Sequence, residues 1–284
     1  MKLMERPGAR PGHGRIPLAV APLGSVLVAL PLGVAVLGPL FAESPAAGVS
    51  APYATSDARY PLGTDGLGRD VLALLLHGGR SALGMALGAV AIAYLVGGLV
   101  GLLAASARRR WADELLIRPL DVLLPLPTLL VISVVAVGWR GSPLAIALAV
   151  AAVNVPPVAR LVRGAALDAA SSPVTEAMRL QGESRIRVQL DHIARSVITP
   201  VAADIGTRIT LAVFLVGSAN FLGLGLNPTA PDWAVSIARG REGLLLQPWA
   251  VLAPAAMLVM FTVGLNLLAD RLLGRSRRTR EDVR

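Results

Sequence analysis

Residues able to perform nucleophilic, acid–base or metal chemistry are few in this sequence and lie far apart. There are no cysteines, and we expect the three histidines, His13, His77 and His192, in separate loops or at loop edges. The sequence contains no His-Glu-x-x-His zinc pair, and no nucleophile–base pair lies near an apolar run. We therefore predict no catalytic residue, no metal site and no enzymatic activity.

The sequence also lacks the residues of a phosphate-binding loop. A phosphate-binding loop needs a glycine-rich turn followed by a lysine at the start of a helix. The only lysine is Lys2, near the N-terminus. The glycine-rich stretch 63–68 follows no predicted strand, so we interpret it as a tight turn. We expect no cofactor to bind this chain itself.

The hydrophobic residues of this chain form long apolar segments. Of the 284 residues, 54% are hydrophobic and 16% are charged, and the mean hydropathy is +0.64. A soluble domain has about 25% charged residues. The apolar residues gather in runs of roughly 20, the length that crosses a hydrocarbon core of about 30 Å. Because backbone amides inside lipid must pair within their own segment, the sequence predicts an all-α integral membrane protein.

We predict about six transmembrane helices, at residues 17–41, 82–106, 116–138, 143–162, 197–221 and 248–269. Glycine and proline inside these runs do not argue against spans, since membrane helices tolerate both. The first run is longer than the usual 7–15-residue core of a signal peptide, so we favour a retained anchor over a cleaved signal.

The distribution of positive charge predicts the orientation. Twenty of the 27 Lys and Arg residues lie before the first span, in alternate loops and after the last span. The positive-inside rule then places both termini in the cytoplasm. We expect a cytoplasmic N-terminal segment (1–16) and a first span with its external loop (17–81). A core transmembrane domain (82–272) with a cytoplasmic loop at about 160–199 follows, and then a basic cytoplasmic tail at anionic lipid (273–284). Despite the net charge of +9, the low aromatic content (4%) argues against nucleic-acid binding.

The 160–199 loop has the pattern of a helix–turn–helix at the membrane surface. Ser172 or Thr175 can cap a short helix, Gly182 can end it in a left-handed conformation, and Ser184 can start the next one. We expect four apolar side chains to point inward: Leu180, Ile186, Val188 and Leu190. Such a knob suits docking to a soluble partner; the alternative is an amphipathic helix that only anchors the loop in the interface.

Two external segments also stand out. In residues 60–70, Asp70 can cap the following helix, and Asp65 and Arg69 can pair locally; a structural turn is preferred over a ligand contact. In residues 220–233, glycines and prolines should break the fifth span and return the chain to the interface. There, Trp233 and Trp249 are predicted interfacial anchors.

In this order, the three segments resemble the inner-membrane permease subunits of ABC importers for dipeptides, oligopeptides and nickel, and most closely the second permease of such systems. Residues 61–70 match that family's Pro-Leu-Gly-Thr-Asp-x-Leu-Gly-Arg-Asp segment, and 221–225 match its Phe-Leu-Gly-Leu-Gly stretch. Its coupling-loop pattern falls on Glu176, Ala177, Gly182 and His192, and its Pro-x-Trp ends at Trp233. The likeness runs from about residue 17 to 272.

The resemblance implies the fold of a type I ABC importer permease in the cell (plasma or inner) membrane. It implies four partners: a second permease in a heterodimer, two ATP-binding subunits that hold ATP and Mg, and an extracytoplasmic solute-binding protein. The implied ATPase-coupling residues are Glu176, Ala177, Arg179, Gly182 and His192, with Glu176 and Arg179 either paired or contacting the ATPase. The implied external-motif residues are Gly63, Asp65, Gly68, Arg69, Asp70, Phe221, Gly223, Gly225 and Trp233.

Asp204 and Arg208 stand four residues apart in the fifth run, which puts them on one helix face. They are either a neutralising structural pair or contacts for the charged ends of a peptide in the translocation path. Peptides are the favoured cargo. Nickel, an opine or an oligosaccharide remains an alternative, and a self-sufficient secondary transporter, a channel or a membrane scaffold are further alternatives from other classes.

Overall fold

The structure, a computed structural model, describes residues 20–45, 50–107 and 109–281. The predicted N-terminal segment 1–16, the start of the first span and the last three residues of the tail lie outside these ranges. Within them the chain forms α-helices, short 3₁₀ and π turns and loops, with one isolated bridge between Thr64 and Asp70 and no β-strand. The prediction of an all-α protein is confirmed.

Among the described residues, five helices are long and apolar enough to cross a membrane, and a shorter apolar helix accompanies them. The helices are α1 (Val20–Leu37), α2 (Val71–Ser106), α3 (Arg110–Asp121), α4 (Thr128–Gly138), α5 (Pro143–Ala170), α6 (Pro173–Leu180), α7 (Arg185–Arg187), α8 (Ala194–Phe221), α9 (Trp233–Gly240) and α10 (Trp249–Glu281). Short turns connect some of them: η1 (Gly38–Leu40), the π-turn η2 (Val188–Ile193) and η3 (Arg241–Gly243).

The second span begins earlier than predicted. Helix α2 starts at Val71 instead of residue 82, because the Asp70 side chain caps it by accepting a hydrogen bond from the Leu72 N–H at 2.9 Å. The first three turns therefore belong to the helix, and they carry His77 and Arg80, which the sequence had suggested for the external loop.

The third predicted span, 116–138, is wrong as a single helix. It consists of the end of α3 and the whole of α4, separated by an irregular segment that contains Pro125 and Pro127. Proline has no N–H to donate and restricts the preceding residue, so the two prolines stop the helical hydrogen-bond pattern. The 11 residues of α4 extend about 16 Å, roughly half a hydrocarbon core.

Helix α3 is charged and is tied to α5 by ion pairs. Arg163 Nε donates to Asp113 Oδ1 at 2.6 Å, and Arg160 Nη2 lies 2.8 Å from Asp121 Oδ1. The Arg163 guanidinium holds the pKa of the Asp113 carboxyl below its usual range. These contacts fix α3 beside the second half of α5.

The closest helix packing in the core joins α2 and α5. A Cβ added at Gly97 would lie 2.8 Å from the Val155 carbonyl oxygen, and one added at Gly101 would lie 2.6 Å from that of Ala159. Small residues allow two membrane helices to approach at this distance. Buried alanines and valines fill the rest of the contact, among them Ala86, Ala89, Val150 and Val158.

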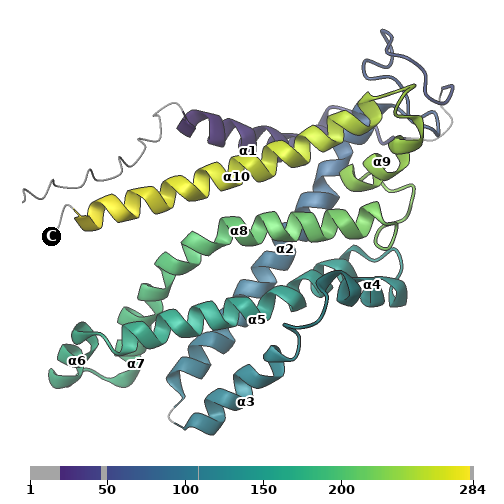
Figure 1. Cartoon of the computed structure of the whole chain (residues 1–284). Helices are drawn as coiled ribbons and strands as arrows, with labels where there is room; N and C mark the ends of the chain where they lie inside the picture. Colours follow the sequence, from purple (N-terminus) through teal and green to yellow (C-terminus); the bar gives the residue numbers. More distant parts are fainter. Residues whose placement is uncertain (1–19, 46–49, 108, 282–284) are drawn as a thin grey trace, which may run out of the picture.

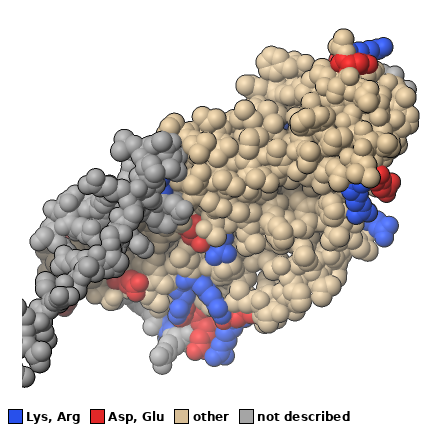
Figure 2. All heavy atoms as spheres, turned by 45° about the horizontal axis from the view of Figure 1, so that its top comes forward, with Lys and Arg blue, Asp and Glu red and all other residues tan. Residues whose placement is uncertain are grey.

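Figure 1 shows how the long helices are arranged. Helices α1 and α10 lie side by side, and α8 packs against α2, α5 and α10. Helix α9 and the loop before α2 lie together at one end of the bundle, which we call the α9 end; α6 and α7 lie at the opposite, α6 end. Figure 2 shows charged side chains towards both ends of one face, with mostly uncharged surface between them.

Candidate functional site

The short helix α6 forms as its sequence predicts. The Ser172 side chain caps it by accepting a hydrogen bond from the Thr175 N–H at 3.3 Å, and Pro173 occupies the first helical position. Gly182 follows its end in a left-handed conformation (φ +81°). Ser184 then accepts from the Arg187 N–H at 3.3 Å and starts the next turn. The predicted short helix and the turn after it are confirmed, but the second stretch is not a separate helix, because α7 continues through η2 into α8.

Three side-chain contacts hold this motif to the ends of the long helices. Thr175, fully buried, donates from Oγ1 to the Ala169 carbonyl oxygen at 2.8 Å, which fixes α6 to α5. Ser172 Oγ and His192 Nε2 lie 3.3 Å apart and join α6 to η2. The loop and α2 are linked by the Gln189 side chain, which donates to Ser106 Oγ at 2.5 Å.

The prediction that four apolar side chains point inward is only partly right. Val188 is buried between α5 and α8, but Leu180 is 83% exposed and Ile186 is 73% exposed. The side chain of Leu190 lies outside the described part of the structure. The anchoring contacts turn the Thr175 side of α6 toward the bundle, so Leu180 faces away from it and the knob carries exposed apolar surface.

Glu176, Ala177 and Arg179 are all exposed on the same short helix. None of the ion pairs of the described residues joins Glu176 to Arg179. The structure therefore does not contain a Glu176–Arg179 ion pair, the first of the two alternatives. Both side chains remain free to contact another molecule.

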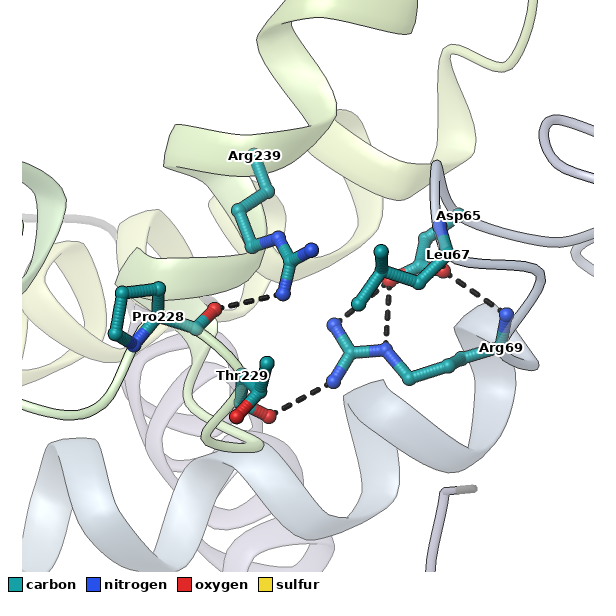
Figure 3. Close-up of polar contacts among 6 residues, drawn as sticks. All are labelled: Asp65, Leu67, Arg69, Pro228, Thr229 and Arg239. Carbon is teal, nitrogen blue, oxygen red and sulfur yellow. Dashed lines mark hydrogen bonds and ion pairs between the residues drawn. The ribbon is translucent and has the colours of Figure 1, made fainter. Parts of the chain in front are cut away.

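At the α9 end, Asp65 and Arg69 form a buried ion pair (Figure 3). Arg69 donates to Asp65 Oδ2 from Nε at 2.9 Å and from Nη2 at 2.7 Å, and its Nη1 donates to the Thr229 carbonyl oxygen at 2.8 Å. Asp65 Oδ1 accepts from the N–H groups of Leu67 and Arg69. The predicted local pair is confirmed, and its saturation favours a structural role over a ligand contact.

The pair also joins two loops that are distant in sequence. Arg239 of α9 donates to the Pro228 carbonyl oxygen at 2.7 Å, next to the Thr229 carbonyl that Arg69 binds. Gly63 (φ +70°) and Gly68 (φ +69°) take left-handed conformations in the first loop. No local pattern predicts a carbonyl partner 160 residues away.

The segment after α8 turns as predicted, but one tryptophan is placed differently. Gly223 is left-handed (φ +72°), and a Cβ on Gly225 would lie 2.2 Å from Asn220 Oδ1. Trp233 is fully buried and donates from Nε1 to the Leu75 carbonyl oxygen at 2.8 Å, so it is not an interfacial anchor. Trp249 is half-exposed, as an anchor requires.

Asp232 caps α9 and is itself buried. Its Oδ1 accepts from the N–H groups of Ala234 and Val235, and its Oδ2 accepts from Ser81 Oγ of α2 at 2.7 Å. Burial raises the pKa of the Asp232 carboxyl, although these hydrogen bonds act in the opposite direction. Neither Ser81 nor Asp232 was among the predicted site residues.

Within the fifth span, Asp204 and Arg208 pair as one of the two hypotheses predicted. Arg208 Nε donates to Asp204 Oδ2 at 2.8 Å, and the Tyr94 hydroxyl of α2 donates to the same oxygen at 2.8 Å. Tyr94 was missed because it stands 110 residues away; its hydroxyl in the middle of an apolar run was the available signal. Elsewhere in the described ranges, no three His, Asp or Glu side chains lie close enough to hold a metal ion.

Comparison with known proteins assigns the chain to a family. Residues 97–279 match the model of the binding-protein-dependent transport system inner membrane component. The chain belongs to this family. Because the described part of the chain has five helices able to span a bilayer, this permease is a multi-pass membrane protein.

Relatives of the permease cover most of its length. It is 32% identical to the di/tripeptide transport system permease protein DppC of Pseudomonas aeruginosa, over 76% of this chain and 71% of that protein. It is 32% identical to the glutathione transport system permease protein GsiD of Pectobacterium atrosepticum, over 74% and 70%. The probable D,D-dipeptide transport system permease protein DdpC of Escherichia coli is 30% identical, over 89% and 85%.

A solved structure shares the fold of the permease. An inward-facing form of the MetNI methionine ABC transporter superposes with a TM-score of 0.53 at 15% identity, over 69% of this chain and 92% of that chain. At this identity the match shows the fold alone. The predicted ABC importer permease fold is thereby confirmed.

Proposed function

We propose that this permease is one of two membrane subunits of an ATP-driven importer that moves di- or oligopeptides from a solute-binding protein into the cytoplasm. Family membership supports a binding-protein-dependent transport role. The peptide cargo is supported by the names of its relatives, which describe permeases for di- and tripeptides, glutathione and D,D-dipeptides.

The observation that carries the coupling role is the construction of α6. Its inner side is fixed by Thr175 to α5, while Glu176, Ala177 and Leu180 project outward. A rigid, exposed helix of this kind suits a groove on a soluble ATPase. Gly182 and His192 complete the proposed coupling site, the first by ending the helix and the second through its contact with Ser172.

The contacts of α6 also suggest how motion is transmitted. A displacement of α6 acts on α5 through Thr175, on η2 and α8 through Ser172 and His192, and on α2 through Gln189 and Ser106. Packed helices linked in this way move as rigid bodies between discrete states. ATP-driven closure of two ATPase subunits therefore tilts several spans at once.

The remaining assignments follow from the same proposal. The α6 end faces the cytoplasm of a cell (plasma or inner) membrane, both termini are cytoplasmic, and the basic tail at 273–284 lies at anionic lipid. The charge asymmetry of the loops supports this orientation. The partners are a second permease, two ATP-binding subunits that hold ATP and Mg, and an extracytoplasmic solute-binding protein; this chain binds no cofactor or nucleic acid and is not an enzyme.

The test is transport by the assembled complex in lipid vesicles. Radiolabelled dipeptide, nickel and an oligosaccharide are each offered with the loaded binding protein, and uptake and ATP hydrolysis are measured together. We expect ATP-dependent uptake of the dipeptide. Uptake of another solute alone would contradict the peptide assignment, and dipeptide uptake without ATP would contradict the ABC mechanism.

A double variant, Glu176→Ala with Gly182→Pro, tests the coupling site in the same vesicles. We expect ligand-stimulated ATP hydrolysis to disappear while the membrane subunits still assemble, as size-exclusion chromatography reports. Hydrolysis that stays fully stimulated would show that the loop is only an anchor.

A further inference from the structure

Among the ion pairs of the described residues, two Asp–Arg pairs with the same four-residue spacing are shielded from solvent, and their hydrogen bonding differs. In the first, Arg69 uses Nε, Nη1 and Nη2 as donors, and Arg69 and Asp65 are 4% and 8% exposed. In the second, Arg208 donates only through Nε, and Arg208 and Asp204 are 19% and 20% exposed. The first pair is thus fully hydrogen-bonded and buried, whereas the second uses fewer of its hydrogen-bonding groups and is more exposed.

The unused groups of the second pair can be named. Asp204 Oδ2 accepts from both Arg208 Nε and the Tyr94 hydroxyl, each at 2.8 Å. No hydrogen bond among the described residues uses Asp204 Oδ1 or the two Nη groups of Arg208. Tyr94 and Asp204 thus hold the guanidinium in place while its outer edge, with two nitrogens, stays available.

The depth of the pair in α8 limits what that edge can face. Asp204 stands 17 residues before the end of α8 at Phe221, which corresponds to about 25 Å along the helix. This position lies within a hydrocarbon core of about 30 Å. Charged groups at such depth face protein or a water-filled path and not lipid. Leu211, two turns from Asp204 on the same face, is also exposed in the isolated subunit.

The net charge of the Asp204–Arg208 pair limits which groups can bind to Arg208. The Asp204–Arg208 pair is neutral, so a permanent carboxylate from a partner protein adds an uncompensated negative charge at membrane depth, which is costly. A zwitterionic peptide adds no net charge. Its terminal carboxylate also fits the planar fork of a guanidinium, which binds carboxylates through two parallel hydrogen bonds.

We propose that Arg208, oriented by Asp204 and Tyr94, binds the terminal carboxylate of a peptide as it crosses the membrane. This site deepens the proposed function and rests on it. Arg208 is the binding residue, and Asp204 and Tyr94 are positioning residues that keep the guanidinium pointing away from its own ion pair.

The test compares permease variants in vesicles with the same wild-type binding protein, so that the selectivity of that protein cancels. The variants are Arg208→Gln and the neutral double substitution Asp204→Asn with Arg208→Gln, which leaves no unpaired charge. For both we expect dipeptide transported per ATP hydrolysed to fall about tenfold, the factor that the loss of a charged hydrogen bond produces. The matched control is the exposed pair of α3, Glu114→Gln with Arg118→Gln, which should transport like wild type.

A photo-cross-linking residue placed at Leu211 identifies what lies beside Arg208 during turnover. We expect a cross-link to labelled dipeptide that Arg208→Gln abolishes. Wild-type transport per ATP in both variants, or a cross-link only to the second permease or to lipid, would overturn this proposal. If the wild-type complex imports no peptide at all, the proposed function itself fails; if it imports peptide and the variants match it, only the carboxylate site is wrong.

Discussion

The guanidinium of Arg69 and the carboxylate of Asp65 approach to 2.7 Å, and both side chains are almost completely buried at the α9 end. The Nε, Nη1 and Nη2 atoms of Arg69 each donate a hydrogen bond, and the acceptor of Nη1 is the Thr229 carbonyl oxygen from a loop near α9. A charge removed from water is tolerated only when its partners are complete. The pair therefore connects the loop before α2 to the loop after α8.

Removing one member of this pair should destabilise the protein strongly. Asp65→Asn leaves the Arg69 guanidinium buried without its counter-charge, which costs about 3–5 kcal/mol in buried ion pairs. We expect a lower midpoint of thermal unfolding for the purified protein. Glu114→Gln, which affects the exposed Glu114–Arg118 pair, should change the free energy of unfolding by less than about 1 kcal/mol. Equal midpoints for the two variants would contradict the assignment.

The contact between α2 and α5 provides a second test with neighbouring controls. Gly101→Ala places a Cβ 2.6 Å from the Ala159 carbonyl oxygen, so the helices must separate. Overpacking of this kind costs about 1–3 kcal/mol. Gly98→Ala meets nothing within 4 Å and should not lower the unfolding midpoint. The close-packing interpretation is wrong if both alanine variants unfold at the same temperature.

Much of the fold was predictable because membrane spans are long and apolar. The errors occurred where a local signal was ambiguous. Pro125 and Pro127 were read as tolerated within a span, yet together they interrupt it, since neither can donate a backbone hydrogen bond. The predicted second span left out the first turns of α2, which carry His77 and Arg80, although the prediction that Asp70 caps the following helix is confirmed.

The candidate site was predictable where its contacts are local. Asp65 and Arg69, like Asp204 and Arg208, are four residues apart, and helical spacing alone brings such pairs together. The third partners, the Thr229 carbonyl and the Tyr94 hydroxyl, lie 160 and 110 residues away in sequence. Only tertiary packing brings them close, so no spacing rule could find them.

The hydroxyl of Thr175 should matter for coupling more than for folding. Thr175→Val keeps the shape of the side chain but removes its 2.8 Å hydrogen bond to the Ala169 carbonyl oxygen, worth about 0.5–1.5 kcal/mol. On the proposed function, we expect less peptide transported per ATP hydrolysed, because α6 is then held less firmly to α5. Ser171→Ala, which removes an exposed hydrogen bond to Asp168, is the control and should couple normally. Equal coupling ratios would show that the hydroxyl does not transmit motion.

Asp232 should make stability depend on pH in a defined direction. Burial raises the pKa of its carboxyl in the folded state, so the native protein holds this proton more tightly than the unfolded chain does. Stability from this group is therefore lost as pH rises from about 4, the ordinary value, through the raised pKa. Asp232→Asn keeps a side-chain oxygen for the Ala234 and Val235 N–H groups but has no charge to bury. We expect the unfolding midpoint of wild type, measured relative to Asp232→Asn, to fall with increasing pH across this window. A difference that rises with pH would mean that the hydrogen bonds from Ser81 and the helix N-terminus outweigh burial.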